Sequence, residues 1–156
     1  MPTPSSSPAA KTASSSSALG LLFRQVRDAM WLRMERELAA SGHSLNFSQY
    51  ITIKSLATSG SDGATNLARL ANLNPGAMTR LLDKLEARGL LARSADPNDR
   101  RALNIRLTEE GESIWRDIEQ CGQRVRERAL RGMDEATRIH MTRLLEQVRD
   151  NLTSED

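Results

Sequence analysis

The sequence contains one cysteine, Cys121, and two histidines, His43 and His140, in 156 residues. A single cysteine cannot form a disulfide within the chain, and it cannot build a zinc site alone. The two histidines lie far apart in the sequence. We therefore expect no metal site and no cofactor.

Long apolar runs are also missing. No segment approaches the roughly 18 consecutive apolar residues that a membrane-spanning helix needs, and residues 1–17 contain no large apolar side chain beyond the initiator methionine. Such a segment cannot bury enough surface to offset its ordering entropy, so we expect residues 1–17 to be a disordered Ser/Pro/Ala-rich tail. The tail lacks the apolar stretch of a secretory signal. We therefore expect a soluble, cytoplasmic, nucleoid-associated protein with no membrane partner.

Motifs of the common enzyme classes are absent from the sequence. It contains no Gly-rich phosphate loop, no nucleophile elbow, no metal-ligand spacing and no pair of acids in an apolar context. We therefore expect that the protein is not an enzyme.

Positive charge is concentrated in one part of the chain. The net charge is only +2, but from Arg69 to Arg106 there are eight Lys and Arg residues and four Asp and Glu residues. The difference gives this segment a charge of +4 and leaves −2 for the remainder. A local excess of this kind is the electrostatic footprint of a polyanionic partner.

Apolar residues recur at spacings of three and four in six segments, which is typical of amphipathic helices. We predict helices at about residues 18–40, 46–58, 65–72, 74–88, 108–129 and 134–152. Residues that favour helix starts support these positions, namely Asn46 with Gln49, Thr65, Asn74 with Pro75, Thr108 and Asp134.

Two short strands complete the pattern. Residues 90–94 and 103–107 are predicted to be strands, and Asp96-Pro97-Asn98-Asp99 between them suits a type I turn. The helices at 65–72 and 74–88, with a short turn between them, match a helix-turn-helix. The predicted fold is mainly α with a small β-wing (α+β), in the order of four helices, a two-stranded wing and two further helices.

We expect a winged helix-turn-helix DNA-binding domain at residues 46–107 and dimerisation helices at 18–45 and 108–152. The apolar stripes of the long terminal helices exceed what a small winged domain can cover. Packing against a second copy would bury them, which predicts a homodimer. A dimer would also hold two recognition helices roughly 34 Å apart, about one turn of a DNA duplex.

With this order in place, the chain resembles the multiple-antibiotic-resistance regulator (MarR) family of bacterial winged-helix repressors, over about residues 19–152. The most specific stretches are residues 74–89, Asn-Pro-Gly-Ala-Met-Thr-Arg-Leu-Leu-Asp-Lys-Leu-Glu-Ala-Arg-Gly, and residues 96–111. The family's wing signature, Asp-x-Arg and then Leu-Thr-x-x-Gly, is matched by Asp99, Arg101, Leu107, Thr108 and Gly111. The resemblance implies a dimeric regulator, most often a repressor, that binds a pseudo-palindromic operator in double-stranded DNA. In many members a small aromatic or phenolic effector releases the protein from DNA.

The resemblance places Thr79 and Arg80, near the start of the helix at 74–88, at the DNA surface. Arg80 would bond a guanine edge through two hydrogen bonds, worth about 1–3 kcal/mol of discrimination, or hold a phosphate. Lys84, one turn further on, is expected to contact the DNA backbone. Asn72 and Asn74 either approach phosphates or cap helices, and we favour capping. From spacing alone, Thr79, Arg80 and Lys84 would equally suit an ordinary solvated helix face.

At the wing tip, Arg101 is expected to enter the minor groove, where a narrowed groove concentrates negative potential. Asp99 is expected to orient Arg101 by a salt bridge, and Arg100 to face a phosphate. The alternative is a charged hairpin tip with only local pairing.

Ligand pockets in the family lie between the dimerisation helices and the winged domain. The resemblance therefore makes Trp31, Met34 and Tyr50 candidates for lining a pocket, with Arg27 available to a ligand carboxylate. Trp and Met at helical spacing are more often plain core or dimer packing. Cys121 lies in an apolar stripe and fits buried packing better than redox sensing. The alternative function is a winged-helix architectural or protein-interaction module without a small-molecule ligand.

Overall fold

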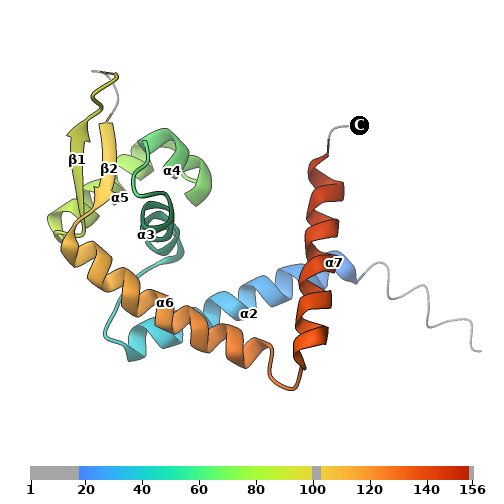
Figure 1. Cartoon of the computed structure of the whole chain (residues 1–156). Helices are drawn as coiled ribbons and strands as arrows, with labels where there is room; N and C mark the ends of the chain where they lie inside the picture. The colour runs from blue at the N-terminus through green and yellow to red at the C-terminus, as the bar shows by residue number, and fades with distance from the viewer. Residues whose placement is uncertain (1–17, 100–102, 155–156) are drawn as a thin grey trace, which may run out of the picture.

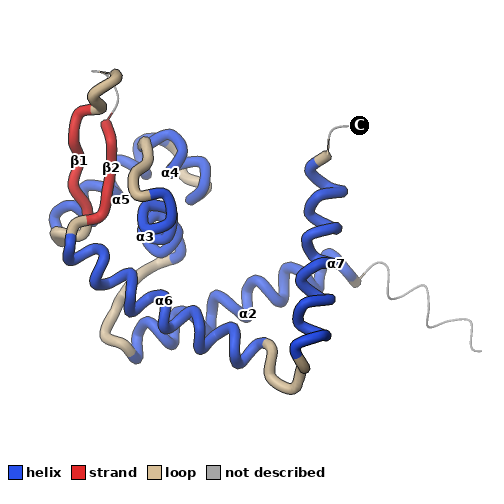
Figure 2. The backbone as a smooth tube through the Cα atoms, in the orientation of Figure 1, coloured by secondary structure: helices blue, strands red, loops and turns tan. Residues whose placement is uncertain are grey.

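The computed structural model describes residues 18–99 and 103–154. Its helices and strands follow the predicted order and confirm a mainly α fold with a small β-wing (Figure 1 and Figure 2). In chain order the elements are α2 (Leu19–Ala40), α3 (Phe47–Ser59), α4 (Ala64–Ala71), α5 (Pro75–Ala87), β1 (Leu91–Ala95), β2 (Leu103–Leu107), α6 (Glu109–Ala129) and α7 (Glu135–Thr153). The prediction that residues 1–17 are disordered concerns residues outside the described ranges.

Four of the five predicted helix caps are confirmed. The side chains of Asn46, Asn74, Thr108 and Asp134 each accept a hydrogen bond from the backbone N–H three residues further along. Each cap satisfies one of the amide groups that a helix start leaves without a partner. These local bonds explain why the helix starts can be identified from short sequence patterns.

The prediction that Thr65 caps α4 is wrong. Gly63 occupies the cap position of α4, without a side-chain cap bond. Just before it, Asp62 and Ile105 form an isolated β-bridge, with N–H···O distances of 3.0 and 2.9 Å. Because this bridge holds the chain extended up to Gly63, the helix begins at Ala64.

The wing is an antiparallel pair in which Leu91 lies opposite Leu107. β1 begins one residue later than predicted because the backbone of Leu90 is still bonded to the last turn of α5. Gly89 adopts φ +73°, and the N–H of Leu90 donates to the carbonyl of Leu85 over 3.0 Å. This left-handed glycine closes the helix and turns the chain into the strand.

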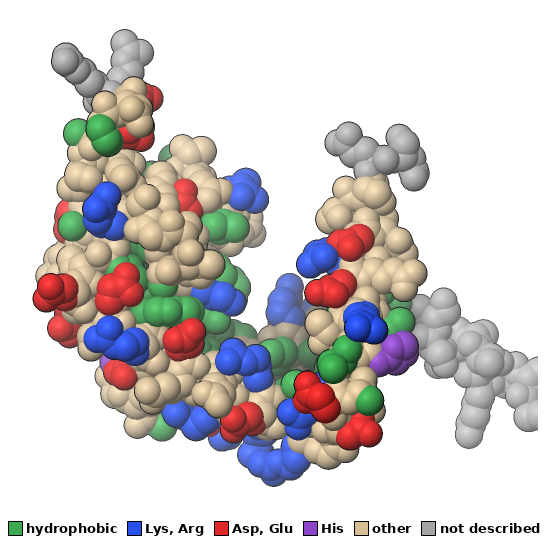
Figure 3. Space-filling model, viewed as in Figure 1, with side chains coloured by type: hydrophobic (Ala, Val, Ile, Leu, Met, Phe, Trp, Pro, Cys, Tyr) green, Lys and Arg blue, Asp and Glu red, His purple; other side chains and the backbone are tan. Residues whose placement is uncertain are grey.

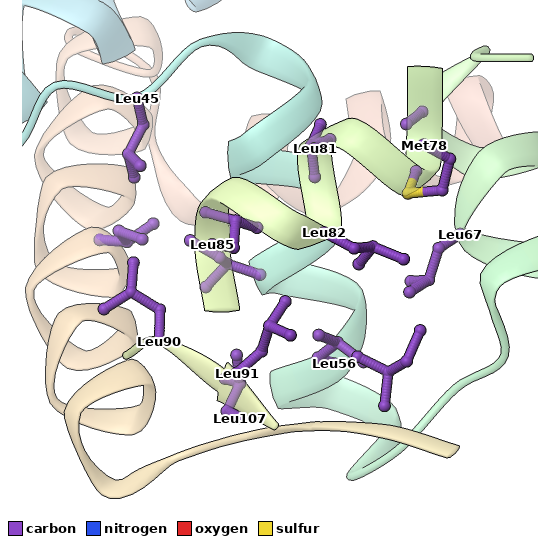
Figure 4. Close-up of a cluster of buried hydrophobic side chains, with 14 of the residues drawn as sticks. Leu45, Leu56, Leu67, Met78, Leu81, Leu82, Leu85, Leu90, Leu91 and Leu107 are labelled. Carbon is purple, nitrogen blue, oxygen red and sulfur yellow. The ribbon is translucent and has the colours of Figure 1, made fainter. Parts of the chain in front are cut away.

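A leucine-rich core lies between α3, α4, α5 and the wing (Figure 4). The predicted inner face of α5 is confirmed, with Met78, Leu81, Leu82 and Leu85 buried. Leu56 and Leu67, from α3 and α4, are fully buried. At roughly 1.5–3 kcal/mol for each fully buried side chain of this size, this packing fixes how the two helices of the helix-turn-helix cross.

The start of α6 is fixed against the end of α5. The N–H of Thr108 donates to the carbonyl of Leu90 over 3.1 Å, and the Thr108 hydroxyl donates to the carbonyl of Gly89. The same hydroxyl oxygen accepts from the N–H of Gly111 at 3.1 Å. Gly111 is buried here, and a Cβ at this position would overlap the carbonyl oxygen of Leu90. Glycine is therefore required for space in this joint.

The remaining helices form an open arc. α6 packs along α2 and leads from the wing to the base of α7, which stands across a hollow from the winged domain (Figure 1 and Figure 3). No residue of α7 is buried. The large apolar side chains exposed on α2 and α7 are Leu19, Leu21, Leu22, Phe23, Val26, Met30, Leu32, Ile139, Leu144, Leu145 and Leu152. Across residues 18–99 and 103–154, no helix combines the length and apolarity needed to cross a bilayer.

We expect Gly111→Ala to lower the free energy of unfolding by about 1–3 kcal/mol, because the added methyl group forces the joint between α6 and Leu90 apart. Urea unfolding followed by circular dichroism measures the change. Gly122→Ala is the matched control in the same helix, where the new Cβ meets only the flexible end of Arg126 at 3.3 Å. Equal stabilities for the two variants would contradict the proposed role of Gly111.

Candidate nucleic-acid interface

The turn between α4 and α5 is built by two asparagines. Asn72 has φ +52° and ψ +47°, the left-handed conformation that asparagine tolerates better than most residues. Two residues later, the Asn74 side chain accepts from the N–H of Ala77 over 2.8 Å, and Pro75 occupies the first helical position. Both residues therefore cap helices, Asn72 through its backbone at the end of α4 and Asn74 through its side chain at the start of α5.

The outer face of α5 carries three of the predicted DNA contacts. Thr79, Arg80 and Lys84 are all exposed and lie opposite the buried leucine face. The Thr79 hydroxyl donates to the carbonyl of Pro75 over 3.0 Å, which fixes its orientation. Within residues 18–99 and 103–154, neither Arg80 nor Lys84 forms an ion pair. Two exposed cations on one helix face, without acidic partners, present positive charge to an incoming polyanion.

The wing tip is only partly described. Arg100 and Arg101, both predicted to contact DNA, lie outside the described residues. Asp99, predicted to orient Arg101, is exposed. Before it, the N–H of Asn98 donates to Oδ1 of Asp96 over 2.8 Å, so this aspartate shapes the turn from its first position as predicted.

One residue of this interface was not identified from the sequence. Arg93 on β1 lies against α5, where its Nη2 is 2.6 Å from Oδ1 of Asp83 and its Nη1 is 3.7 Å from Oε2 of Glu86. Its side chain is 21% exposed. The two acids are three residues apart, so they share a helix face, but nothing in the local pattern shows that a strand residue lies opposite that face.

An apolar crevice of about 480 Å³ lies where α2 and α6 meet α3. Its volume lies in the range of small-molecule sites, roughly 300–1,000 Å³. It brings together all four residues predicted to bind a ligand, which are Arg27, Trp31, Met34 and Tyr50. The other lining residues are Phe23, Val26, Met30, Phe47, Lys54, Gly122, Val125 and Arg126.

The crevice has an aromatic wall. The Trp31 ring packs edge-to-face on Phe47, with centroids 5.1 Å apart, and lies 5.5 Å from the Tyr50 ring. These contacts also satisfy the packing interpretation of Trp31, whose side chain is half-buried, while Met34 is only 5% exposed.

Two cations of the crevice were not identified from the sequence. Lys54 lies with its Nζ 5.9 Å from the Tyr50 ring centroid, and Arg126 enters from α6. The position of Lys54 four residues after Tyr50 could have indicated the first, whereas no local signal links Arg126 to α3. The predicted Arg27 is 72% exposed and pairs with Asp28 at 2.9 Å. Lys54 and Arg126 are therefore the freer cations for an anionic ligand.

A second apolar crevice, of about 430 Å³, also lies between α2 and α6. It shares Val26, Met30 and Val125 with the first and extends to Leu32 and Ala129. The same part of α2, around Val26 and Met30, therefore lines both crevices.

A polar cluster joins α2 to α6 beside the crevices. Glu37 accepts from Arg33 at 2.6 Å and from Arg124 at 2.7 Å. Arg124 also donates to Sγ of Cys121 over 3.2 Å and to the hydroxyl of Ser41 over 3.3 Å. Cys121 is fully buried, as its place in the apolar stripe predicted. The hydrogen bond from Arg124 lowers the pKa of Glu37 against the opposing effect of burial, and Arg33 lowers this pKa further.

Metal ligation has no support in the described part of the chain. No three His, Cys, Asp or Glu side chains of residues 18–99 and 103–154 lie close enough together to hold an ion.

Known proteins share both the sequence pattern and the fold. A family model described as the MarR family matches residues 45–103. The uncharacterized HTH-type transcriptional regulator YhbI of Bacillus subtilis (strain 168) is 33% identical over 99 residues, which cover 60% of this chain and 64% of YhbI. The chain therefore matches less than two thirds of the length of this relative.

Two solved structures resemble most of the chain. The transcriptional regulator PA3341 is 31% identical with a TM-score of 0.73, covering 85% of this chain and 96% of that chain. BpsR of Bordetella bronchiseptica, whose DNA binding is regulated by 6-hydroxynicotinic acid, is 22% identical with a TM-score of 0.69, covering 85% of this chain and 93% of BpsR. The likeness to BpsR concerns the fold alone.

We expect the stability contributed by Glu37 to depend on pH. Because its pKa in the folded protein lies below the ordinary value of 4.5, the charged form stabilises the fold above that pH, and the contribution is lost as the pH falls through the lowered value. Glu37→Gln should therefore lower the melting temperature at neutral pH, and the difference from the unmodified protein should shrink as the pH falls below about 4.5. Thermal unfolding at stepped pH measures this.

Glu35→Gln, at an exposed position of the same helix, is the matched control. A deficit of Glu37→Gln that is equally large in acid and at neutral pH would show that packing, not charge, accounts for its effect.

Proposed function

Because this chain belongs to the MarR family, we propose that it is a dimeric transcriptional regulator, acting as a repressor, that binds a pseudo-palindromic DNA operator. The observation that carries the proposal is the pair of exposed cations Arg80 and Lys84 on the outer face of α5, without ion pairs in the described residues. The leucine core behind α5 holds this face rigid. A helix that contacts base edges in a DNA groove must hold its side chains in a fixed orientation.

We assign different tasks to the DNA-facing residues. Arg80 and Thr79 lie in the first half of α5, the half that enters a major groove in helix-turn-helix proteins, so they contact base edges. Lys84, one turn further on, contacts phosphate. Arg100 and Arg101 extend the contact from the wing to a phosphate and the minor groove.

The proposed dimer rests on the exposed terminal helices. α7 buries no residue, and its Leu144 and Leu145 are 48% and 45% exposed. On α2, Leu22 is 53% exposed. Large apolar side chains exposed along two helices in this way mark an interaction site. A second copy that covers both helices would hold the two winged domains, residues 46–107, at a fixed separation, with 18–45 and 108–152 as the dimerisation region.

The proposed effector is an aromatic acid bound in the crevice of about 480 Å³. The aromatic wall of Trp31, Phe47 and Tyr50 suits a planar ring. Lys54 and Arg126 suit a carboxylate. BpsR, a protein of the same fold, responds to a hydroxylated aromatic acid of this class.

We expect the protein to prefer its operator over random duplex by roughly 10³ or more at fixed salt. Arg80→Ala should cost about 1–3 kcal/mol and relax the preference at one base pair, because a base-edge contact is lost. Lys84→Ala should weaken operator and random duplex alike and reduce the salt slope by about one, because a phosphate contact is lost. Fluorescence anisotropy on operators selected from a random pool measures these changes.

Arg116→Ala, an exposed cation of α6, is the matched control for loss of one charge. Equal affinity of the unmodified protein for operator and random duplex would overturn the regulator and favour an architectural DNA-binding module.

We expect 6-hydroxynicotinate and 4-hydroxybenzoate to quench the fluorescence of Trp31 in a Trp115→Phe background and to release the protein from its operator. Cyclohexanecarboxylate, which lacks the aromatic ring, should bind about two- to tenfold more weakly because it cannot stack. Lys54→Met should weaken aromatic-acid binding about tenfold by removing a charged hydrogen-bond donor. Arg24→Met, an α2 cation outside the crevice, should leave it unchanged. Equal effects of these two variants would rule out the crevice as the effector site.

A further inference from the structure

The charge on α5 depends on how its two acids are held. Asp83 and Glu86 are the only acids of this helix, and Arg80 and Lys84 are its only cations. Asp83 lies three residues after Arg80, a spacing at which opposite charges on a helix attract each other. Asp83 nevertheless pairs with Arg93 at 2.6 Å, and Arg80 has no ion pair in the described residues.

Arg93 reaches both acids from outside the helix. It comes from β1, and its two terminal nitrogens face Asp83 at 2.6 Å and Glu86 at 3.7 Å. Its own side chain is 21% exposed, whereas those of Asp83 and Glu86 are 56% and 43% exposed. The Arg93 charge therefore lies on the protein side of the two acids and holds them towards the wing.

We propose that Arg93 is a positioning residue for DNA binding, which masks Asp83 and Glu86 so that Arg80 and Lys84 stay free for the operator. Without Arg93, the Asp83 carboxylate is released towards Arg80, at the spacing where the two pair, and both acids repel phosphate. This inference rests on the proposed function. It adds that the wing strand controls the charge of the recognition helix as well as the position of the wing tip.

The test is a rescue experiment on the full-length protein with the selected operator. Arg93→Met should weaken operator binding about tenfold and relax the preference at the base pair that Arg80 contacts, because Arg80 becomes engaged by Asp83. Adding Asp83→Asn to Arg93→Met removes the released acid and should restore most of the affinity and of the base preference. Asp83→Asn alone should change the affinity less than about threefold.

Controls separate masking from a merely structural role. Arg88→Met, at the end of α5 and outside both acid pairs, removes one positive charge and should have little effect. Circular dichroism melts of every variant report whether the fold is retained. If Arg93→Met is folded and Asp83→Asn fails to restore its DNA binding, the masking role is wrong and Arg93 only stabilises the packing of β1 on α5.

The outcomes also distinguish this inference from the proposed function. If the unmodified protein shows no operator preference, the proposed function fails. If it prefers its operator and Arg93→Met binds as tightly, the proposed function stands and the masking role of Arg93 is wrong.

Discussion

The contact between the carbonyl of Leu90 and the first turn of α6 holds the parts of this fold together. At this point the end of α5, the start of the wing and the start of α6 meet within one set of hydrogen bonds, made by backbone groups and the Thr108 hydroxyl. No side chain fits between them at position 111. Because the contact is made at close range by backbone atoms and the short Thr108 side chain, it leaves little freedom for α6 to rotate against α5. The orientation of the outer face of α5 is therefore tied to that of α6, the helix that leads to α7.

The second constraint is that α2 serves several surfaces at once. Val26 and Met30 line both crevices and are themselves largely exposed. A ligand in one crevice and an apolar partner surface in the other would therefore contact the same side chains. Protein interiors are close-packed and contain few voids, so a displacement of these side chains at one crevice is transmitted to the other. α2, whose exposed residues line both crevices, is therefore the helix through which two such binding events would influence each other.

Local features of this protein could be predicted from sequence, and long-range ones could not. The caps at Asn46, Asn74, Thr108 and Asp134 depend on bonds over three residues, so short patterns identify them. Thr65 was assigned wrongly because a bridge between Asp62 and Ile105, 43 positions apart by their numbers, decides where α4 begins.

The candidate sites divide in the same way. Arg80 and Lys84 are four residues apart on one helix, so periodicity groups them. Arg93 pairs with acids on a neighbouring element, and Arg126 lies on a helix distant in sequence from α3. Only the packing of β1 on α5 and of α6 near α3 brings the two arginines into place.

The unbroken length of α6 has a mechanical meaning. Its 21 residues span about 30 Å, so a tilt of about 10° at the α7 end displaces the wing end by roughly 5 Å. A regulator built in this way can lose its fit to DNA when α6 tilts as a rigid rod, while every bond inside the winged domain stays intact.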